Sequence, residues 1–246
     1  MTVMETLKSL LEAGGVQLTD AAYERLAGYH ALLLAWNEKM DLTNVPEEEM
    51  AVRHYADSLL PLSHTEWFKE GAKLIDVGTG AGFPGLMLAI VRPDLQVTLL
   101  DAQRKRCDFL QTVCDTLNLK NVTVLHARAE DGARGNLREM MDLAVARAVA
   151  PLNVLCEYLV PYVKIGGYAL CWKGPAVKDE IPAGQKAAQL LGGKAEELIR
   201  LPIEGREHYI QPVKKMVATA RRYPRKSGTP SKEPLGSDTP KGEKKK

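Results

Sequence analysis

The sequence predicts a Rossmann-like α/β fold, in which a mostly parallel sheet of seven strands follows an N-terminal helical extension. From Lys73 onward, short apolar runs alternate with longer helical patterns, which is typical of βα units in a parallel sheet with helices on both faces. A glycine-rich segment follows the first of these runs, at the place where such sheets bind ligands. Before Lys73, apolar residues recur every three or four positions, which indicates helices.

Residues 1–66 are interpreted as a helical extension packed on the core. Two helices are expected from apolar residues at helical spacing, which are Leu7, Leu10 and Leu11, followed by Tyr23, Leu26, His30, Leu33 and Leu34. A third helix is expected after Pro46, because proline suits a first helical turn and three glutamates lie near the positive end of the helix dipole.

Residues 67–223 are predicted to form the ligand-binding domain. Five apolar runs predict its parallel strands, at residues 74–77, 97–100, 122–125, 143–145 and 168–172. Residues 198–203 and 215–220 are predicted to close the sheet as the sixth and seventh strands. Helical spacing between these runs indicates the crossover helices that parallel strands require.

Composition narrows the class of protein. With 45% hydrophobic and 26% charged residues, the chain is typical of a globular protein. No signal peptide or membrane-spanning run is recognised, so we expect a cytoplasmic location without a membrane partner. Four cysteines, Cys107, Cys114, Cys156 and Cys171, lack the paired spacing of a zinc site. We therefore expect reduced core cysteines and no metal site.

Positive charge is concentrated at the end of the chain. Residues 221–246 contain nine Lys or Arg and three Asp or Glu, a net charge of +6, which leaves the rest of the chain at −4. A basic segment on a mildly acidic body indicates a polyanionic partner. We interpret residues 224–246 as a basic, flexible tail, because hydrophobic periodicity is lost there.

The glycine-rich loop admits two cofactors. Gly80, Gly82 and Gly85 match the dinucleotide pattern G-x-G-x-x-G, whereas Asp76 with Gly78, Gly80 and Gly82 matches the D-x-G-x-G-x-G form used for S-adenosylmethionine. A carboxylate before the loop repels a pyrophosphate but attracts the ammonium and sulfonium groups of S-adenosylmethionine. The loop therefore favours S-adenosylmethionine and a class I methyltransferase.

Later strand ends supply further candidates for cofactor binding. Asp101 ends the second strand, where an acid accepts hydrogen bonds from ribose hydroxyls, and this holds for either cofactor. Ala129 and Glu130 follow the third strand, where an adenine edge is usually read.

The methyl acceptor is expected at the end of the fourth strand, where Arg147 stands. Arg147 is predicted to contact the cofactor or the acceptor edge of guanine, and Lys173 has a similar position after the fifth strand. We recognise no catalytic groups that other acceptors need, namely the motif of amine methyltransferases, a loop cysteine nucleophile or a histidine–carboxylate base. Guanine N7 requires none of these, since it carries a free lone pair. A salt bridge at the strand end remains the alternative for Arg147.

Taken together, longer motifs resemble those of the bacterial 16S ribosomal RNA guanine-N7 methyltransferases, the glucose-inhibited division protein B family. The matching segments are Trp36-Asn37 with Leu42-Thr43, residues 53–59 (RHYADSL), residues 76–85 (DVGTGAGFPG), residues 128–130 (RAE), residues 147–150 (RAVA) and residues 223–232 (YPRKSGTPSK). The resemblance runs through most of the chain and implies methyl transfer to N7 of one guanine in the small-subunit RNA.

The resemblance also implies site residues. It implies cofactor contacts at Gly78, Phe83, Ala129, Glu130 and Arg147, with Asp101, Ala102 and Gln103 beside the ribose and adenine. It suggests that the helix carrying Arg53 and His54 borders the cleft, and these two residues and Lys173 are predicted to contact the RNA there. An intrahelical Arg53–Asp57 ion pair remains open. RNA contacts are predicted at the end of the chain by Arg221, Arg222, Tyr223, Arg225, Lys226 and Lys232.

Two other functions remain open at this point. One is a methyltransferase of the same fold that acts on a small molecule or a protein, and the other is a non-catalytic RNA-binding assembly factor. The expected partner is 16S ribosomal RNA or the small ribosomal subunit, and nothing in the sequence requires more than a monomer.

Overall fold

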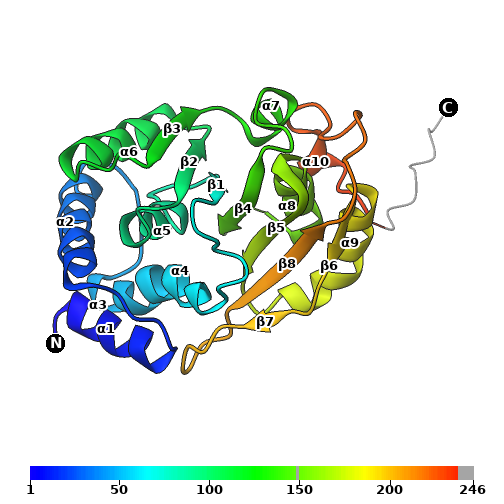
Figure 1. Ribbon diagram of the computed structural model, residues 1–246. Helices are drawn as coiled ribbons and strands as arrows, with labels where there is room; N and C mark the ends of the chain where they lie inside the picture. Colours follow the sequence, from blue (N-terminus) through cyan, green and yellow to red (C-terminus); the bar gives the residue numbers. More distant parts are fainter. Residues whose placement is uncertain (148–149, 238–246) are drawn as a thin grey trace.

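The computed structural model describes residues 1–147 and 150–237, and its centre is one twisted sheet (Figure 1). The strands are β1 (Lys73–Val77), β2 (Gln96–Asp101), β3 (Val122–His126), β4 (Met141–Arg147), β5 (Val163–Lys173), β6 (Gly193–Ala195), β7 (Ile199–Arg200) and β8 (Tyr209–Lys215). Their order is β3-β2-β1-β4-β5-β8-β6, and β7 also pairs with β8. The first five strands are parallel, whereas β8 is antiparallel to its neighbours. The predicted fold class is confirmed.

The last strands differ from the prediction. The predicted sixth strand at residues 198–203 is reduced to the two-residue β7, and the predicted seventh at 215–220 is wrong, because β8 ends at Lys215. Residues 209–215 read Tyr-Ile-Gln-Pro-Val-Lys-Lys, which is no apolar run. Gln211 is nevertheless buried because its side-chain amide donates to two backbone carbonyls.

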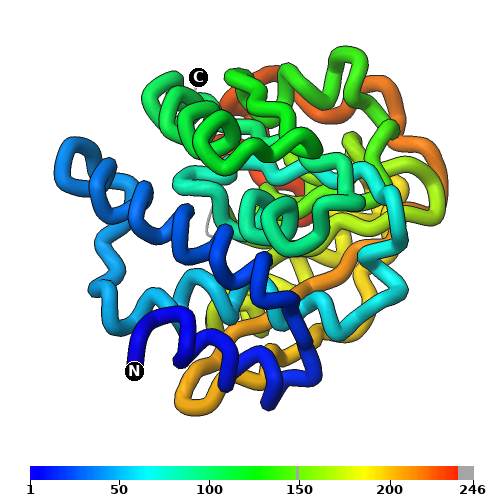
Figure 2. Tube along the Cα trace, turned by 60° about the vertical axis from the view of Figure 1, so that its left-hand side comes forward, coloured from blue at the N-terminus to red at the C-terminus, as the bar shows by residue number. Residues whose placement is uncertain are grey.

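One face of the sheet is covered by helices from the N-terminal half of the chain. These are α1 (Val3–Ala13), α2 (Asp20–Asn37), α5 (Gly85–Val91) and α6 (Arg104–Thr116), together with the helical stretch described below. Thr2 and Thr19 cap the first two helices with their hydroxyls. Leu7, Leu26 and Leu33 are fully buried in one core with Leu74 of β1. Figures 1 and 2 show α1 and α2 together along one side of the molecule.

A continuous helical stretch brings residues 47–63 to the edge of the sheet. It consists of α3 (Glu47–Met50), the π-helix η1 (Ala51–Ala56), α4 (Asp57–Leu59) and the 3-10 helix η2 (Leu60–Ser63). The wider π turn carries Arg53 and His54 and leads directly into Asp57. Short π segments inside helices are frequent at functional sites. Here the helical stretch turns the side chains of His54 and Asp57 and the backbone carbonyl of Arg53 toward Arg147 at the end of β4.

The opposite face is covered by helices from the second half. They are α7 (Ala129–Arg134), α8 (Leu152–Leu159), the 3-10 helix η3 (Val160–Tyr162), α9 (Val177–Leu190) and α10 (Thr229–Lys232). Residues 223–235 pack on this layer, as the orange and red segment beside α7 and α8 in Figure 1 shows. Tyr223 is 7% exposed, and Tyr158 hydrogen-bonds Ser231 at 2.7 Å.

These contacts contradict the flexible tail expected from residue 224, as far as residue 237. The rest of that tail lies outside the described residues. The four cysteines are free and buried, as expected. In the described part of the chain, no helix is long and apolar enough to cross a membrane.

Candidate functional site

The glycine loop leaves β1 with three residues in left-handed conformations. The φ angles are +73° at Gly78, +61° at Gly80 and +105° at Gly82, a region that favours glycine. A Cβ atom at Gly80 would meet no atom within 4 Å, so this residue faces open space. At Gly82 it would lie 2.7 Å from Leu86, which makes Gly82 a packing residue. The predicted cofactor contact at Gly82 is therefore not supported by its surroundings.

Asp76 shapes this loop from beneath. It is fully buried, and its Oδ2 accepts hydrogen bonds from the Thr79 hydroxyl at 2.7 Å and the Gly85 backbone N–H at 2.8 Å. Its Oδ1 has no hydrogen-bond partner within the described residues. Burial raises the pKa of the carboxyl group to about 6. Asp76 thus fixes the loop and does not line the cavity above it. The attraction predicted between its carboxylate and a positively charged cofactor would therefore act across the loop, without direct contact.

Replacing Asp76 by asparagine is expected to change the pH dependence of stability. Its pKa is raised from 3.8 to about 6 in the folded chain. Between pH 3.8 and pH 6, Asp76 is therefore protonated in the folded chain and ionised in the unfolded chain. This contribution to stability is present at low pH and lost as the pH rises through 6. Urea unfolding measures the free energy of unfolding of both proteins at pH 4 and at pH 7. The wild-type value minus the Asp76→Asn value should be about 2 to 3 kcal/mol lower at pH 7 than at pH 4. An unchanged difference would contradict the raised pKa.

A first cavity, of about 430 Å³, lies above the loop at the carboxyl ends of β1 and β2. Its lining includes seven of the predicted cofactor residues, which are Gly78, Gly80, Phe83, Asp101, Ala102, Gln103 and Arg147. Asp101 is 3% exposed, and its two oxygens accept from the backbone N–H groups of Gly80 at 2.9 Å and Gln103 at 2.8 Å. Each oxygen keeps a second lone pair for a ligand hydroxyl.

A smaller cavity of about 160 Å³ adjoins the first at Gly78 and Ala102 and is lined by Ala129 and Glu130. The Tyr162 hydroxyl donates to the Ala129 carbonyl at 2.6 Å, and Glu130 accepts from the Gly228 backbone N–H at 2.8 Å. The structure therefore brings the predicted adenine-side residues to the same edge of the sheet. It also ties Glu130 to the C-terminal segment.

Arg147 ends β4 at the far side of the first cavity and is held by four groups. Its guanidinium donates to the Arg53 carbonyl and to Asp57 Oδ2, both at 2.9 Å, and lies 3.2 Å from His54 Nδ1. It also lies over the Phe83 ring, 4.9 Å from the ring centre. The strand-end salt bridge considered above exists, but it orients Arg147 between two cavities.

His54 is neutral in this arrangement. Its ring stacks on Phe83 with the centres 4.3 Å apart, and burial and the charge of Arg147 lower its pKa to about 3. Because guanidinium only donates, Nδ1 of His54 accepts from Arg147, and Nε2 carries the proton donated to the Thr43 hydroxyl at 2.7 Å. Thr43 thereby links the π-helix to the loop before it.

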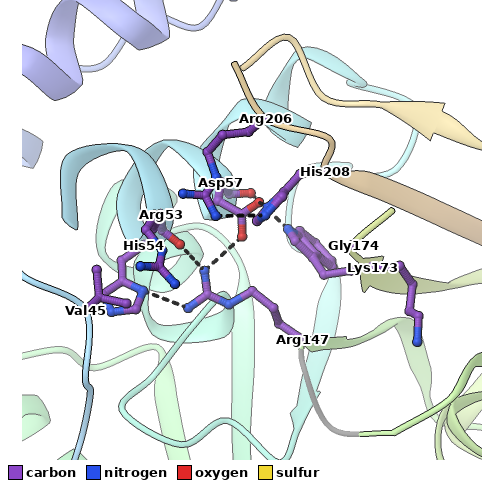
Figure 3. A pocket seen from close by; sticks show the side chains of 10 residues that line it. Val45, Arg53, His54, Asp57, Arg147, Lys173, Gly174, Arg206 and His208 are labelled. Carbon is purple, nitrogen blue, oxygen red and sulfur yellow. Dashed lines mark hydrogen bonds and ion pairs between the residues drawn. The ribbon is translucent and has the colours of Figure 1, made fainter. Parts of the chain in front are cut away.

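A second cavity, of about 370 Å³, meets the first at His54 and Arg147 (Figure 3). Asp57 lines it and is fully buried, with Oδ1 accepting from His208 Nδ1 at 2.6 Å. Burial favours the neutral acid, but the hydrogen bond from His208 and the charge of Arg147 outweigh it and hold the pKa of Asp57 below its usual value. Arg206 completes the row, since its guanidinium lies 3.4 Å from His208 Nε2.

Sequence reasoning missed Arg206 and His208 in this lining. His208 lies 151 positions from its partner Asp57, and no local pattern marks it. The sequence did not reveal this histidine–carboxylate pair. The Arg53–Asp57 ion pair left open above is wrong, because Arg53 pairs with Glu49 at 2.8 Å.

The predicted RNA-binding residues separate into two groups. Arg53, His54 and Lys173 line the second cavity, although Lys173 is paired with Glu180 at 2.6 Å and its ammonium group points away from the cluster in Figure 3. Near the end of the chain, Arg221, Arg222, Lys226 and Lys232 are exposed.

Two predictions in the C-terminal strip are corrected by burial. Tyr223 is buried, so its ring is no stacking platform for a base. Arg225 holds the fully buried Glu157, with contacts of 2.7 and 3.0 Å to its two oxygens. Such a pair anchors the segment and leaves Arg225 occupied.

Comparison with known proteins agrees with this geometry. The family model described as rRNA small subunit methyltransferase G matches residues 22–209. A protein of that name from Alkaliphilus oremlandii is 45% identical and aligns with 96% of this chain and 100% of its own length. Another from Clostridium botulinum strain Eklund 17B is 47% identical, over 90% of this chain and 94% of its own.

Solved structures share the fold at low sequence identity. A mutant 16S rRNA (adenine(1408)-N(1))-methyltransferase from Catenulisporales acidiphilia superimposes with a TM-score of 0.52 at 13% identity, over 64% of this chain and 91% of that one. Similarity at this level shows the class I methyltransferase fold alone. With the family model covering most of the chain and relatives above 40% identity over nearly its full length, this chain belongs to the rRNA small subunit methyltransferase G family.

Proposed function

We propose that this chain transfers a methyl group from S-adenosyl-L-methionine to N7 of a specific guanine in 16S ribosomal RNA. Membership of a small-subunit rRNA methyltransferase family supports the reaction type and the RNA. The position of Arg147 is the main structural support for this proposal. Arg147 lies where the first cavity, which suits a nucleoside cofactor, meets the second, cation-lined cavity. The proposal requires one copy of the chain, because both cavities are built from it, and places the reaction in the cytoplasm with the ribosomes.

The residues around the first cavity fit the cofactor. Gly80 leaves its space open, and Asp101 offers two carboxylate oxygens to ribose hydroxyls. Phe83 lines the same cavity but is buried, and its ring supports His54 and Arg147. S-adenosylmethionine supplies an electrophilic methyl group on a positively charged sulfur. Asp57 offsets the charge of Arg147 there, so that the cavity does not present an unpaired cation to a cationic ligand.

N7 of guanine needs positioning and no general base, because its lone pair is free in the neutral base. The cluster is suited to that task. Arg147 is fixed by Asp57, His54 and a backbone carbonyl, and His54 is neutral and already shared between Arg147 and Thr43. Neither group needs to move a proton for the methyl group to be transferred.

A second candidate is methylation of a guanine nitrogen that must lose a proton, and the His208–Asp57 pair at 2.6 Å favours it. A histidine oriented by a carboxylate is a common general base. Against this, His208 Nε2, the nitrogen left to take a proton, faces the guanidinium of Arg206, which only donates.

Chemical identification of the product separates these candidates. Purified chain, S-adenosylmethionine and 16S rRNA that lacks the modification should yield 7-methylguanosine on nuclease digestion and mass spectrometry. Recovery of 1-methyl- or N2-methylguanosine would support the general-base candidate, and an unmodified RNA would contradict both.

Replacing Asp101 by alanine is expected to weaken cofactor binding by about 10- to 100-fold, because a charged acceptor for hydroxyls is worth about 1.5 to 3 kcal/mol. The loop also loses the acceptor for its Gly80 N–H. Calorimetric titration with S-adenosylhomocysteine measures this. An exposed acid on the next helix, Asp108, provides the control, and Asp108→Ala should bind as the wild type does. Equal affinity of all three proteins would remove Asp101 from the cofactor site.

Exposed lysines at the end of the chain are expected to contact RNA phosphates. Deleting residues from 221 onward would expose the core around Tyr223, so charge removal is the cleaner test. Lys226→Gln with Lys232→Gln should weaken binding of 16S rRNA about tenfold and lower the slope of log affinity against log salt by about 1.4, or 0.7 per phosphate. Lys69→Gln with Lys120→Gln, which removes two other exposed lysines, is the control. Identical slopes for both pairs would exclude this strip.

A further inference from the structure

The second cavity contains charged groups that the proposed reaction does not yet use. Its volume of about 370 Å³ lies within the range of pockets that hold small organic ligands, about 300 to 1,000 Å³. Residues outside the common βα units build much of it, since Arg53 and Asp57 come from the N-terminal helical stretch, and Arg206 and His208 from the connection between β7 and β8. These additions surround the place where the first cavity ends at Arg147.

Three of the four Arg and Lys side chains in this lining already have an acid. Arg53 pairs with Glu49, Arg147 with Asp57 and Lys173 with Glu180, at distances of 2.8, 2.9 and 2.6 Å. Their positive charges are therefore largely neutralised by acids of the protein.

Arg206 differs from the other three. No carboxylate of the described residues lies within ion-pair distance of it, and its Nε is buried with no hydrogen-bond partner. Its guanidinium approaches His208 Nε2 at 3.4 Å, a contact that Figure 3 draws. No acid of the described residues therefore holds the guanidinium, and Arg206, which lines the cavity, keeps donors for a ligand.

We propose that Arg206 binds a backbone phosphate of the RNA beside the acceptor guanine. This inference rests on the proposed function. An arginine without an acid is suited to a phosphate, because the planar guanidinium donates to two phosphate oxygens at once and its charge is neutralised. A contact to the base fits less well, since a donor placed on N7 would occupy the lone pair that receives the methyl group. Asp57 and His208 then act as positioning residues. One oxygen of Asp57 holds Arg147, and the other holds His208, which contacts Arg206.

Kinetics of Arg206 variants at several salt concentrations test this assignment. With 16S rRNA that lacks the methyl group, Arg206→Gln should raise KM about tenfold and leave kcat within about twofold, since phosphate contacts position the substrate. The slope of log KM against log potassium chloride should fall by about 0.7, the value for one phosphate of a single strand. Arg206→Lys should recover part of the loss.

The control is Arg200→Gln, which removes an exposed arginine at the end of β7, just before the same connection, and should change neither KM nor the slope. A raised KM with an unchanged slope would show an uncharged contact and overturn the phosphate assignment. An unchanged KM would overturn it too. Affinity for S-adenosylhomocysteine should be equal in all variants, and its loss would show that Arg206 only supports the fold.

The assignment can fail separately from the proposed function. If the wild type does not methylate the RNA, the proposed function is wrong. Filter binding of the same RNA by wild type and Arg206→Gln still tests whether Arg206 contacts a phosphate. A slope difference of about 0.7 would support the contact, and equal slopes would overturn it.

Discussion

Arg147→Ala is expected to lower kcat for methyl transfer at least about 100-fold, the usual effect of removing a preorganised charged group from a reacting centre. The same change leaves Asp57, fully buried, without its guanidinium partner. Removing one member of a buried ion pair costs about 3 to 5 kcal/mol, so stability should fall as well. Methyl-transfer assays under saturating cofactor, with urea unfolding of the same preparations, measure the two effects.

A double variant separates catalysis from folding. Arg147→Ala combined with Asp57→Asn removes the unpaired charge and should recover much of the lost stability without recovering kcat. The matched control is Arg225→Ala, which breaks the ion pair to fully buried Glu157, and neither residue lines the first or the second cavity. It should reduce stability to a similar degree and leave kcat within about twofold. If the double variant regains activity together with stability, Arg147 is a structural residue.

Gly80→Val is expected to abolish cofactor binding, with affinity falling by about 100-fold or more, which corresponds to about 3 kcal/mol. A side chain at Gly80 is expected to enter the first cavity, because Gly80 lines it and no atom beyond its chain neighbours lies within 4 Å of the Cβ position. Valine at a φ of +61° also strains the backbone by about 1 to 2 kcal/mol. Titration with S-adenosylhomocysteine measures the affinity.

Gly15→Val controls for the backbone strain. Gly15 has a φ of +77°, is exposed and also has nothing within 4 Å of its Cβ position, but it follows α1, far along the chain from the cavity. It should lower stability similarly and leave cofactor affinity unchanged. Equal affinities of the two variants would show that Gly80 does not face the cofactor.

The sequence predicted the parts of the site that follow consecutive strands. Gly78, Gly80, Asp101 and Ala129 could be placed because the carboxyl ends of parallel strands meet at one edge. Each residue ends a strand or follows it within three positions. The same rule brought Arg147 to this edge. Local pattern and sheet topology were sufficient for these residues.

The remaining residues depend on contacts that no local pattern records. His208 acquires its role from Asp57, 151 positions away, and Arg206 from the connection that precedes β8. In the basic segment, Tyr223 and Arg225 resemble an RNA-binding strip, but burial and Glu157, 68 positions away, give them structural tasks. β8 was misplaced because polar Gln211 and Lys215 are buried with their hydrogen bonds satisfied.

Mapping guanine methylation in 16S rRNA from cells with and without this chain tests the proposed methyl transfer. Cleavage at 7-methylguanosine, read along the whole RNA, should reveal one position that loses its methyl group in the deletion strain. The wild-type chain should restore it, and the chain carrying Arg147→Ala with Asp57→Asn should not. An unchanged methylation pattern in the deletion strain would contradict the proposed function.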